Sequence, residues 1–255
     1  MSINSNLLEA KDVNVSFGGL KALTNVNLVV AHKEVVGLIG PNGAGKTTLF
    51  NAICGIVTPD SGQFSLNGNT TEWPATHKLA SLGIARTLQG VGLFPELTVI
   101  ENVMIGAQRF AKSGLISASL GLNTRDEQAL ERRAHIALER VYASGLSSRV
   151  AGTLSYPDAK RVGIARALVS NPQILLLDEP AGGLGAQDIE WLNRLISELA
   201  GEMSVLIVEH HMDVVMSVCD RIYVLNFGQV ISSGTPDHVR NDPAVISAYL
   251  GENAQ

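Results

Sequence analysis

The sequence predicts an α/β fold built around a mainly parallel sheet. Strand-like and helix-like segments alternate along much of the chain, which is typical of parallel strands joined by helices. Polar residues follow several of the apolar strands, at the edge of a parallel sheet where ligands bind. The pattern G-x-x-x-x-G-K-[ST] also occurs at residues 40–47, between a predicted strand and a predicted helix. These three observations predict a phosphate-binding site at the carboxyl ends of the strands.

The N-terminal third of the chain is predicted to be mostly strands. They are expected at residues 7–17, 26–31, 35–39 and 63–66, with turns at residues 18–19, 59–62 and 67–68. Phe17 closes the first of them beside the Gly18-Gly19 turn. An aromatic ring at a turn can stack on a purine, because stacking needs only a flat π face. A place in the core is the alternative for Phe17.

The predicted phosphate loop lies between the apolar run at residues 34–39 and a helical pattern that starts near Thr48. Glycines let the backbone aim successive N–H groups at phosphate oxygens, and the helix that follows adds its positive end. We expect Lys46 to reach the β- and γ-phosphates and Thr47 to give its hydroxyl to Mg²⁺. The alternative is a glycine-rich turn that caps an ordinary helix. The residues predicted to surround the phosphates are Gly40, Pro41, Asn42, Gly43, Ala44, Gly45, Lys46, Thr47 and Thr48.

The middle of the chain is predicted to be mainly helical. A short helix at residues 76–82 and a strand-like run at residues 84–88 lead to Gln89. Thr98 and Glu101 form a capping-box pattern at the start of the next helix. A connector is expected at residues 111–122, a charge-rich and solvated helix at 126–142, and another helix ending near Val169. We therefore predict a helical lobe at residues 90–170, inserted into an α/β core of residues 1–89 and 171–255.

Two carboxylates follow the run Ile174-Leu175-Leu176-Leu177, whose four apolar residues indicate a strand buried on both faces. Asp178 is placed to accept a hydrogen bond from water on Mg²⁺. Glu179 is placed to polarise a water that attacks phosphate. A helix cap after a core strand is the alternative for this pair.

The rest of the chain again alternates. A helix is predicted at residues 186–199, and a buried strand at residues 205–208 ends at Glu209-His210-His211. A histidine at a strand end can contact a γ-phosphate, and the alternative for His210 is a surface or capping role. A helix at 212–218, a hairpin of strands at 221–225 and 229–232, and short helices at 236–240 and 243–250 complete the chain.

The composition of the chain excludes some classes of function. The formal net charge is −5 at pH 7, which argues against a general nucleic-acid binder with a basic surface. Cys54 and Cys219 lie far apart and have no metal-binding or redox spacing, so buried apolar roles are expected. No signal peptide is expected at the N-terminus. No apolar run approaches the roughly 20 residues that span a bilayer. Any membrane role is therefore expected to go through a partner.

In this order, the motifs resemble the ATP-binding cassette (ABC) family over essentially the whole chain. The family implies a P-loop NTPase (RecA-like) core with an antiparallel β subdomain and an inserted α-helical subdomain. It implies that Phe17 stacks on adenine and that Glu179, His210 and Gln89 serve catalysis. Thr47, Gln89 and Asp178 are implied as the groups around Mg²⁺. Ser155 belongs to the signature segment, which in this family contacts the ATP of the opposite subunit.

The resemblance also implies partners. ATP and Mg²⁺ would lie between the phosphate loop of one subunit and the signature segment of another, in a homodimer or a heterodimer with a second cassette. Closure would drive an integral-membrane permease through a groove near Gln89, at the cytoplasmic face of the cell membrane. Residues 15–23, 86–89 and 234–251 are similar to ATPase subunits of branched-chain amino acid importers, which work indirectly with a substrate-binding protein.

The chain departs from the family in two places. The family signature L-S-G-G-Q is replaced by Leu154-Ser155-Tyr156-Pro157-Asp158. Pro157 has no N–H, and Asp158 adds negative charge near a phosphate; alternatively, both residues suit the start of a helix. Gly185 stands where Asn or Asp is usual. The sequence therefore leaves open a nucleotide-gated scaffold with weak hydrolysis. It also leaves open a soluble cassette protein of repair or translation, although those usually carry two cassettes or long inserts.

Overall fold

Two compact units divide the chain in the computed structural model, which describes residues 6–88, 90–110 and 124–250. The first unit comprises Met1–Leu79, Leu176–Gly182 and Ile189–Gln255, and the second comprises Ala80–Leu175 and Gly183–Asp188. The predicted helical lobe at residues 90–170 falls within the second unit, and its bounds stay a prediction. The connector predicted at residues 111–122 lies outside the described residues.

An antiparallel sheet forms one part of the first unit. Its strands run in the order β2-β1-β4-β5, and each neighbouring pair is antiparallel. β2 begins earlier than predicted, because Leu23 and Leu20 continue the pairing opposite Val15 and Phe17 after local register shifts. β5 was missed, since its three residues are all exposed and show no hydrophobic alternation. The strands are β1 (Asn6–Phe17), β2 (Leu20–Ala31), β4 (Ser61–Leu66) and β5 (Asn69–Thr71).

The second sheet has the order β10-β9-β3-β8-β7-β6. β3 pairs in parallel with both β8 and β9, whereas β9 and β10 form the predicted antiparallel hairpin. Every residue of β3 and β8 is buried, which explains the apolar runs at residues 35–39 and 205–208. The strands are β3 (Val35–Ile39), β6 (Ile84–Arg86), β7 (Ile174–Asp178), β8 (Ser204–Val208), β9 (Arg221–Asn226) and β10 (Gln229–Gly234).

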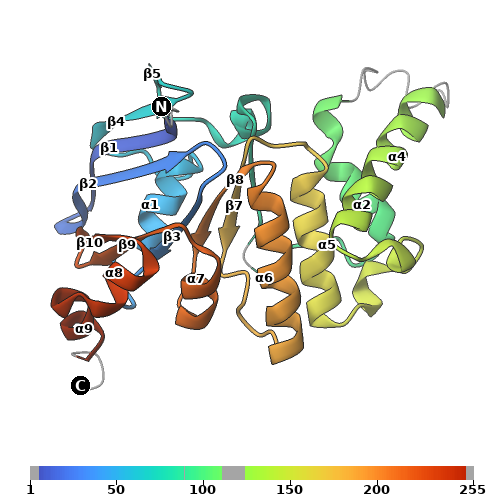
Figure 1. The fold of residues 1–255 in the computed structure, drawn as a ribbon. Coiled ribbons are helices and arrows are strands. Elements are labelled where there is room, and N and C mark those ends of the chain that lie inside the picture. Colours follow the sequence, from blue (N-terminus) through green and yellow to red (C-terminus); the bar gives the residue numbers. More distant parts are fainter. Residues whose placement is uncertain (1–5, 89, 111–123, 251–255) are drawn as a thin grey trace. The chain divides into compact units, whose positions relative to one another are not determined.

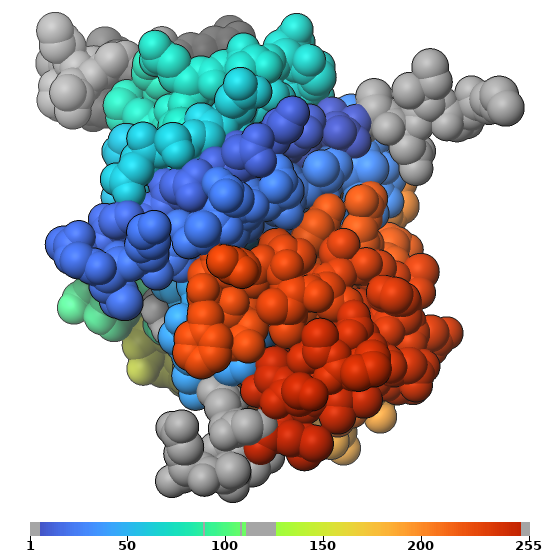
Figure 2. All heavy atoms as spheres, turned by 90° about the vertical axis from the view of Figure 1, so that its left-hand side faces the viewer, coloured from blue at the N-terminus to red at the C-terminus, as the bar shows by residue number. Residues whose placement is uncertain are grey.

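Helix α1 (Lys46–Ile53) contacts both β2 and β8, so it packs between the two sheets (Figure 1). The sheets also meet directly where β2 lies against β9 and β10. The backbone N–H of Val29 donates to the hydroxyl of Tyr223 at 3.2 Å, and that of Thr24 donates to the carbonyl of Gly228 at 2.8 Å. Figure 2 shows this meeting of the blue N-terminal strands and the orange C-terminal hairpin. The core of the first unit is therefore closed by segments from opposite ends of the chain.

The remaining helices of the first unit follow the predictions closely. α8 contacts β9 and β10, and α9 contacts β10. Helix α6 starts at the predicted residue and ends one residue beyond the predicted one. Within the described part of the chain, no helix has the length and apolar character that a bilayer span requires. The helices are α6 (Ala186–Ala200), α7 (Met212–Val218), α8 (Pro236–Asn241) and α9 (Pro243–Leu250).

Three α-helices that contact one another form most of the second unit (Figure 1). The capping box predicted at Thr98 and Glu101 is present at the start of the first of them. The second ends at Arg140, earlier than predicted, and Tyr142 beyond it has φ +58°, outside the helical region. The helices are α2 (Val99–Gly106), α4 (Thr124–Arg140) and α5 (Tyr156–Leu168), with 3₁₀ turns η1 (Thr76–Leu82), η2 (Gln108–Phe110), η3 (Ser144–Leu146) and η4 (Ala151–Thr153).

Candidate functional site

Three neighbouring strands of the first unit carry the segments predicted to meet a nucleotide. β8 lies between β3 and β7, so the phosphate loop, the His210 segment and the Asp178-Glu179 pair follow adjacent strands. Backbone bonds tie the strand ends together: Glu209 N–H donates to Leu38 O at 3.4 Å, and Glu179 N–H donates to Val208 O at 2.9 Å. These bonds gather the three segments at one edge of the sheet.

The phosphate loop has a backbone that glycine adopts most easily at three positions. Gly40 has φ +149°, Gly43 has φ +75° and Gly45 has φ +103°. A Cβ on Gly40 would lie 2.0 Å from the carbonyl oxygen of Leu225, and one on Gly45 would lie 2.7 Å from that of Ala22. Gly45 is also the N-cap of α1, and no side chain caps this helix. No side-chain cap therefore competes with an anion for the first N–H groups of the helix.

The side chain of Lys46 folds over the phosphate loop. Its Nζ donates to the carbonyl oxygens of Gly40 at 2.7 Å and Pro41 at 2.9 Å. Thr47 is exposed at the start of α1. A phosphate on the loop would offer the ammonium group stronger, charged acceptors than these two carbonyls.

Phe17 is 52% exposed at the end of β1, so the alternative that places it in the core is wrong. The next residue, Gly18, has φ +58° and forms the turn to β2. The ring therefore presents apolar surface to solvent at the position where adenine stacking was predicted.

Glu179 has a backbone conformation that is unusual for its residue type. Its φ is +46°, in the left-handed region, which costs a non-glycine residue about 1–3 kcal/mol. The bond to Val208 O and a bond from Gly182 N–H to Glu179 O at 3.2 Å hold it there. Its Oε1 lies 3.9 Å from Nδ1 of His210, and both side chains are partly exposed. This arrangement directs the carboxylate toward His210 at a backbone position that glycine would occupy with less strain.

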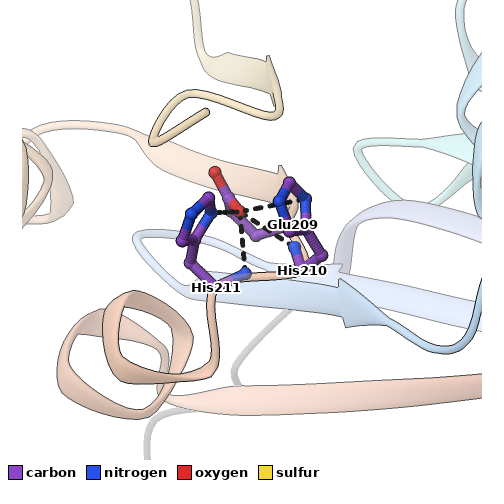
Figure 3. A group of neighbouring side chains, drawn as sticks. All are labelled: Glu209, His210 and His211. Carbon is purple, nitrogen blue, oxygen red and sulfur yellow. Dashed lines mark hydrogen bonds and ion pairs between the residues drawn. The ribbon is translucent and has the colours of Figure 1, made fainter. Parts of the chain in front are cut away.

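Glu209 is a fully buried carboxylate whose importance the sequence analysis missed (Figure 3). Its Oε1 accepts from Ala181 N–H at 2.6 Å, and its Oε2 accepts from the N–H groups of His210 at 2.8 Å and His211 at 3.0 Å. Oε2 also lies 3.0 Å from Nδ1 of His211. Burial by itself would raise the pKa of Glu209, but the N–H groups of His211, Ala181 and His210 and the His211 ring bring it below its ordinary value. The signal in the sequence was an acidic residue directly after the four apolar residues 205–208.

A metal ion is a possible occupant for this cluster by distance alone. In the part of the chain that the structure describes, ligand atoms of Glu209, His210 and His211 lie within 4.8 Å of one another. However, the carboxylate oxygens already accept three backbone N–H groups and face the His211 ring. The cluster is therefore a hydrogen-bonded anchor for the backbone rather than a metal site.

The signature segment opens helix α5 in the second unit. Ser155 is the N-cap: its Oγ accepts from Asp158 N–H at 3.3 Å and donates to Asp158 Oδ2 at 2.7 Å. Pro157 lies in the first turn, where a missing N–H costs the helix nothing. The interpretation that Pro157 and Asp158 suit a helix start is confirmed. The Ser155 hydroxyl, however, donates to the carboxylate of Asp158 in the same segment.

Gln89, predicted to serve catalysis and to lie near Mg²⁺, lies outside the described residues. A Cβ on Gly185 would meet nothing within 4 Å, so a side chain fits there and glycine is not required by packing.

Comparison with known proteins decides the family. The family model described as "ABC transporter" matches residues 23–182. This chain belongs to the ABC transporter family. A second model, described as "Branched-chain amino acid ATP-binding cassette transporter", matches residues 229–255 of this ABC protein. The family predicted from the ordered motifs is thus confirmed.

The cassette is similar to curated relatives along nearly its whole length. It is 43% identical over 251 residues to the high-affinity branched-chain amino acid transport ATP-binding protein LivG of Escherichia coli (strain K12), covering 96% of this chain and 98% of that protein. It is 41% identical over 251 residues to the protein of the same description named BraF from Pseudomonas aeruginosa, with the same coverage of 96% and 98%.

Solved ABC cassettes share the fold. The ADP conformation of MJ1267, an ATP-binding cassette of an ABC transporter, superposes with a TM-score of 0.84 at 32% identity, covering 96% of this chain and 99% of that one. The dimeric post-hydrolysis state of the cassette MJ0796, bound to ADP and Pi, has a TM-score of 0.75 at 27% identity, covering 90% and 98%. The predicted α/β fold of the P-loop NTPase type is confirmed.

Proposed function

We propose that this chain is the ATP-binding and ATP-hydrolysing subunit of a membrane importer for branched-chain or related amino acids. The observation that carries the proposal is the arrangement of a phosphate loop, Glu179 and His210 on adjacent strand ends in a chain that is 43% identical to LivG. In this proposal, the loop N–H groups, Lys46 and the uncapped start of α1 hold the phosphates. Phe17 holds the adenine.

The oxygen groups of this chain suit Mg²⁺. Thr47 offers an exposed hydroxyl at the start of α1, and Asp178 offers a half-buried carboxylate at the end of β7. Hard oxygen donors of this kind are those that Mg²⁺ takes beside substrate phosphates, with Gln89 as a further group. When bound, Mg²⁺ would neutralise phosphate charge. Glu179 would accept a hydrogen bond from the attacking water. His210 would contact the γ-phosphate.

The proposed transporter also requires a second cassette, permease subunits and a substrate-binding protein. We place the chain in a homodimer or a heterodimer with a second cassette, with Ser155 facing the ATP of the opposite subunit; the dimeric state of MJ0796 supports this. Integral-membrane permease subunits would bind near Gln89, and a substrate-binding protein would deliver the amino acid. The chain would then lie at the cytoplasmic face of the membrane.

Reconstitution tests the whole proposal. The chain would be purified with candidate permease subunits and placed in vesicles that enclose Mg-ATP and carry the binding protein and labelled leucine outside. We expect leucine uptake that requires ATP hydrolysis. Hydrolysis of ATP without uptake of leucine, isoleucine or valine would contradict the assignment of branched-chain amino acids as the transported substrates. The absence of Mg-ATP binding would contradict the function as a whole.

A nucleotide-gated scaffold with weak hydrolysis is a second candidate, which the signature segment favours. Pro157 removes one N–H, and the Ser155 hydroxyl donates to Asp158 at 2.7 Å. Loss of one donor to a developing anion can cost about a hundredfold in rate. Very slow turnover of the wild-type chain with its permease would support this candidate over the importer motor.

Restoring the missing N–H is expected to speed turnover. Pro157→Ala returns a donor to the first turn of α5 and keeps a good helix former there. We expect its steady-state ATP hydrolysis with the permease present to rise by about tenfold, within the range that one such donor controls. The control is Pro243→Ala in α9, which also changes a proline at a helix start. A rate equal to that of the wild type would show that the segment does not limit hydrolysis.

Removing the aromatic ring at residue 17 is expected to weaken ATP binding. Stacking of an aromatic side chain on a base contributes about 1–3 kcal/mol, so Phe17→Ala should raise the Kd for Mg-ATP by roughly fivefold or more. Phe17→Trp should keep the affinity. Calorimetric titration with Mg-ATP and with tripolyphosphate separates the base from the phosphates. An equal loss of affinity for both ligands, or none for either, would contradict stacking. Leu20→Ala, across the same turn, is the control for lost apolar surface.

A further inference from the structure

We propose that Glu209 is a positioning residue for hydrolysis: its buried carboxylate holds His210 and the turn after Glu179 in one fixed arrangement. The inference rests on the proposed function, since it assigns a role within the same site. The family motifs do not include this residue, and its side chain would act through its neighbours rather than on ATP.

The first step of the argument concerns the turn that carries Glu179. Oε1 of Glu209 accepts from Ala181 N–H at 2.6 Å, two residues beyond Glu179. Glu179 N–H itself donates to Val208 O at 2.9 Å, directly before Glu209 in the chain. The turn is therefore tied at two points to the end of β8. These ties hold Glu179 in its left-handed conformation, which a free loop would leave.

The second step concerns His210. Oε2 of Glu209 accepts from His210 N–H at 2.8 Å and from His211 N–H at 3.0 Å, and it lies 3.0 Å from Nδ1 of His211 (Figure 3). The His211 ring lies against the His210 ring, with centroids 4.2 Å apart. Nδ1 of His210 lies 3.9 Å from Glu179 Oε1 and 3.8 Å from Glu209 Oε2. Glu209 thus sets the backbone of His210 directly and its ring through His211.

The third step is that only a carboxylate serves all these donors. Two oxygens accept from three backbone N–H groups and face one imidazole nitrogen in a fully buried place. A glutamine has one acceptor oxygen, and its NH₂ group would face N–H donors. Buried donors left without acceptors are costly, so the turn or the histidine backbone would shift. A shift of about 1 Å can cost about a hundredfold in rate.

Glu34 provides a matched control. It is also a buried carboxylate of the first unit, and it accepts from Ala31 N–H at 2.7 Å and Arg221 Nε at 2.8 Å. It precedes β3, whereas the phosphate loop follows that strand, so it lies at the other end from the nucleotide site. Glu34→Gln therefore removes a comparable buried charge without touching the catalytic segments.

The first measurement is the kinetics of Mg-ATP hydrolysis by the full chain with its permease. We expect Glu209→Gln to lower kcat by about a hundredfold, with a change in KM for ATP of less than about threefold. Glu34→Gln should keep kcat within about threefold of wild type. In a His210→Ala background, Glu209→Gln should lower kcat by less than about tenfold, because its effect passes partly through His210. Full additivity of the two changes, or an unchanged kcat, would overturn the proposal.

The second measurement is the ¹⁵N spectrum of the histidine rings in the full chain without nucleotide. Glu209→Gln is expected to shift the ring signals of both His210 and His211, and Glu34→Gln to leave them in place. Unmoved signals in a folded Glu209→Gln variant would overturn the positioning role, even if the wild type hydrolysed no ATP. If the ring signals shift as expected but the wild-type chain hydrolyses no ATP, the proposed function is contradicted and the positioning role is not.

Glu209→Asp covers the case in which Glu209→Gln does not fold. It keeps the charge but shortens the side chain by one methylene group, so it cannot reach all the donors at once. We expect it to fold and to lower kcat by at least about tenfold. Hydrolysis at the wild-type rate by Glu209→Asp would count against the proposal.

Discussion

Glu179→Gln is expected to lower the steady-state rate of ATP hydrolysis by about a hundredfold or more, the usual contribution of a general base. Glutamine keeps the shape of the side chain and its bond from the backbone N–H to Val208, but it cannot polarise the attacking water. Binding of Mg-ATP should remain, because the phosphate loop is untouched. The dimer should then accumulate in Mg-ATP, as size-exclusion chromatography with light scattering would show.

Two further variants separate chemistry from folding in this prediction. Glu179→Gly should also stop hydrolysis, yet it should stabilise the fold by about 1 kcal/mol, since glycine adopts φ near +46° without strain. Glu190→Gln, an exposed carboxylate in α6, should behave as wild type. Unchanged hydrolysis by Glu179→Gln would rule out the assigned role.

Lys46→Ala is expected to raise the Kd for Mg-ATP by about ten- to a hundredfold. A hydrogen bond to a charged group contributes about 1.5–3 kcal/mol, and each 1.4 kcal/mol is a factor of about ten in affinity. In the free chain the Lys46 ammonium donates to Gly40 and Pro41 carbonyls, so it is already held over the loop. Little ordering is then needed for it to meet phosphate, and its loss removes most of the charge attraction.

Thermal unfolding measures this effect directly. Ligand at a hundred times its Kd stabilises the native state by about 2.7 kcal/mol, which raises the Tm of a chain this long by about 5–11 °C. We expect that rise for the wild type and for Lys11→Ala, an exposed lysine of β1. With a Kd ten- to a hundredfold higher, Lys46→Ala should show about half of that rise or less at the same ATP concentration. A full rise for Lys46→Ala would place the phosphates elsewhere. The Tm of Lys46→Ala without nucleotide reports separately on the loss of the two hydrogen bonds to the Gly40 and Pro41 carbonyl oxygens.

Strong local signals made much of the fold predictable. The runs at residues 174–177 and 205–208, in β7 and β8, contain only apolar residues, because they are covered on both faces of the sheet. The phosphate loop was predictable because its glycines meet a steric need, as the Leu225 carbonyl against Gly40 shows. The capping box at Thr98 depends only on residues three apart, so tertiary contacts did not alter it.

The misses have a common physical cause. β5 consists of three exposed residues whose strand conformation comes from pairing with β4, a partner that no local pattern reveals. The early start of β2 likewise depends on its pairing with β1. In the sequence, Glu209 is only a polar residue at the end of a predicted strand. Only the folded chain shows that Ala181, from another strand end, donates to it.

By itself, the sequence determined the family, the parallel core and the residues that would meet a nucleotide, because each is encoded in contiguous residues with a local physical reason. The tertiary structure decided how strand ends from residues 39, 178 and 208 are joined, and that a buried carboxylate links the last two of them. Such bonds form between segments distant in the sequence. Their donors and acceptors have no periodicity, so only the packed strands bring them within hydrogen-bonding distance.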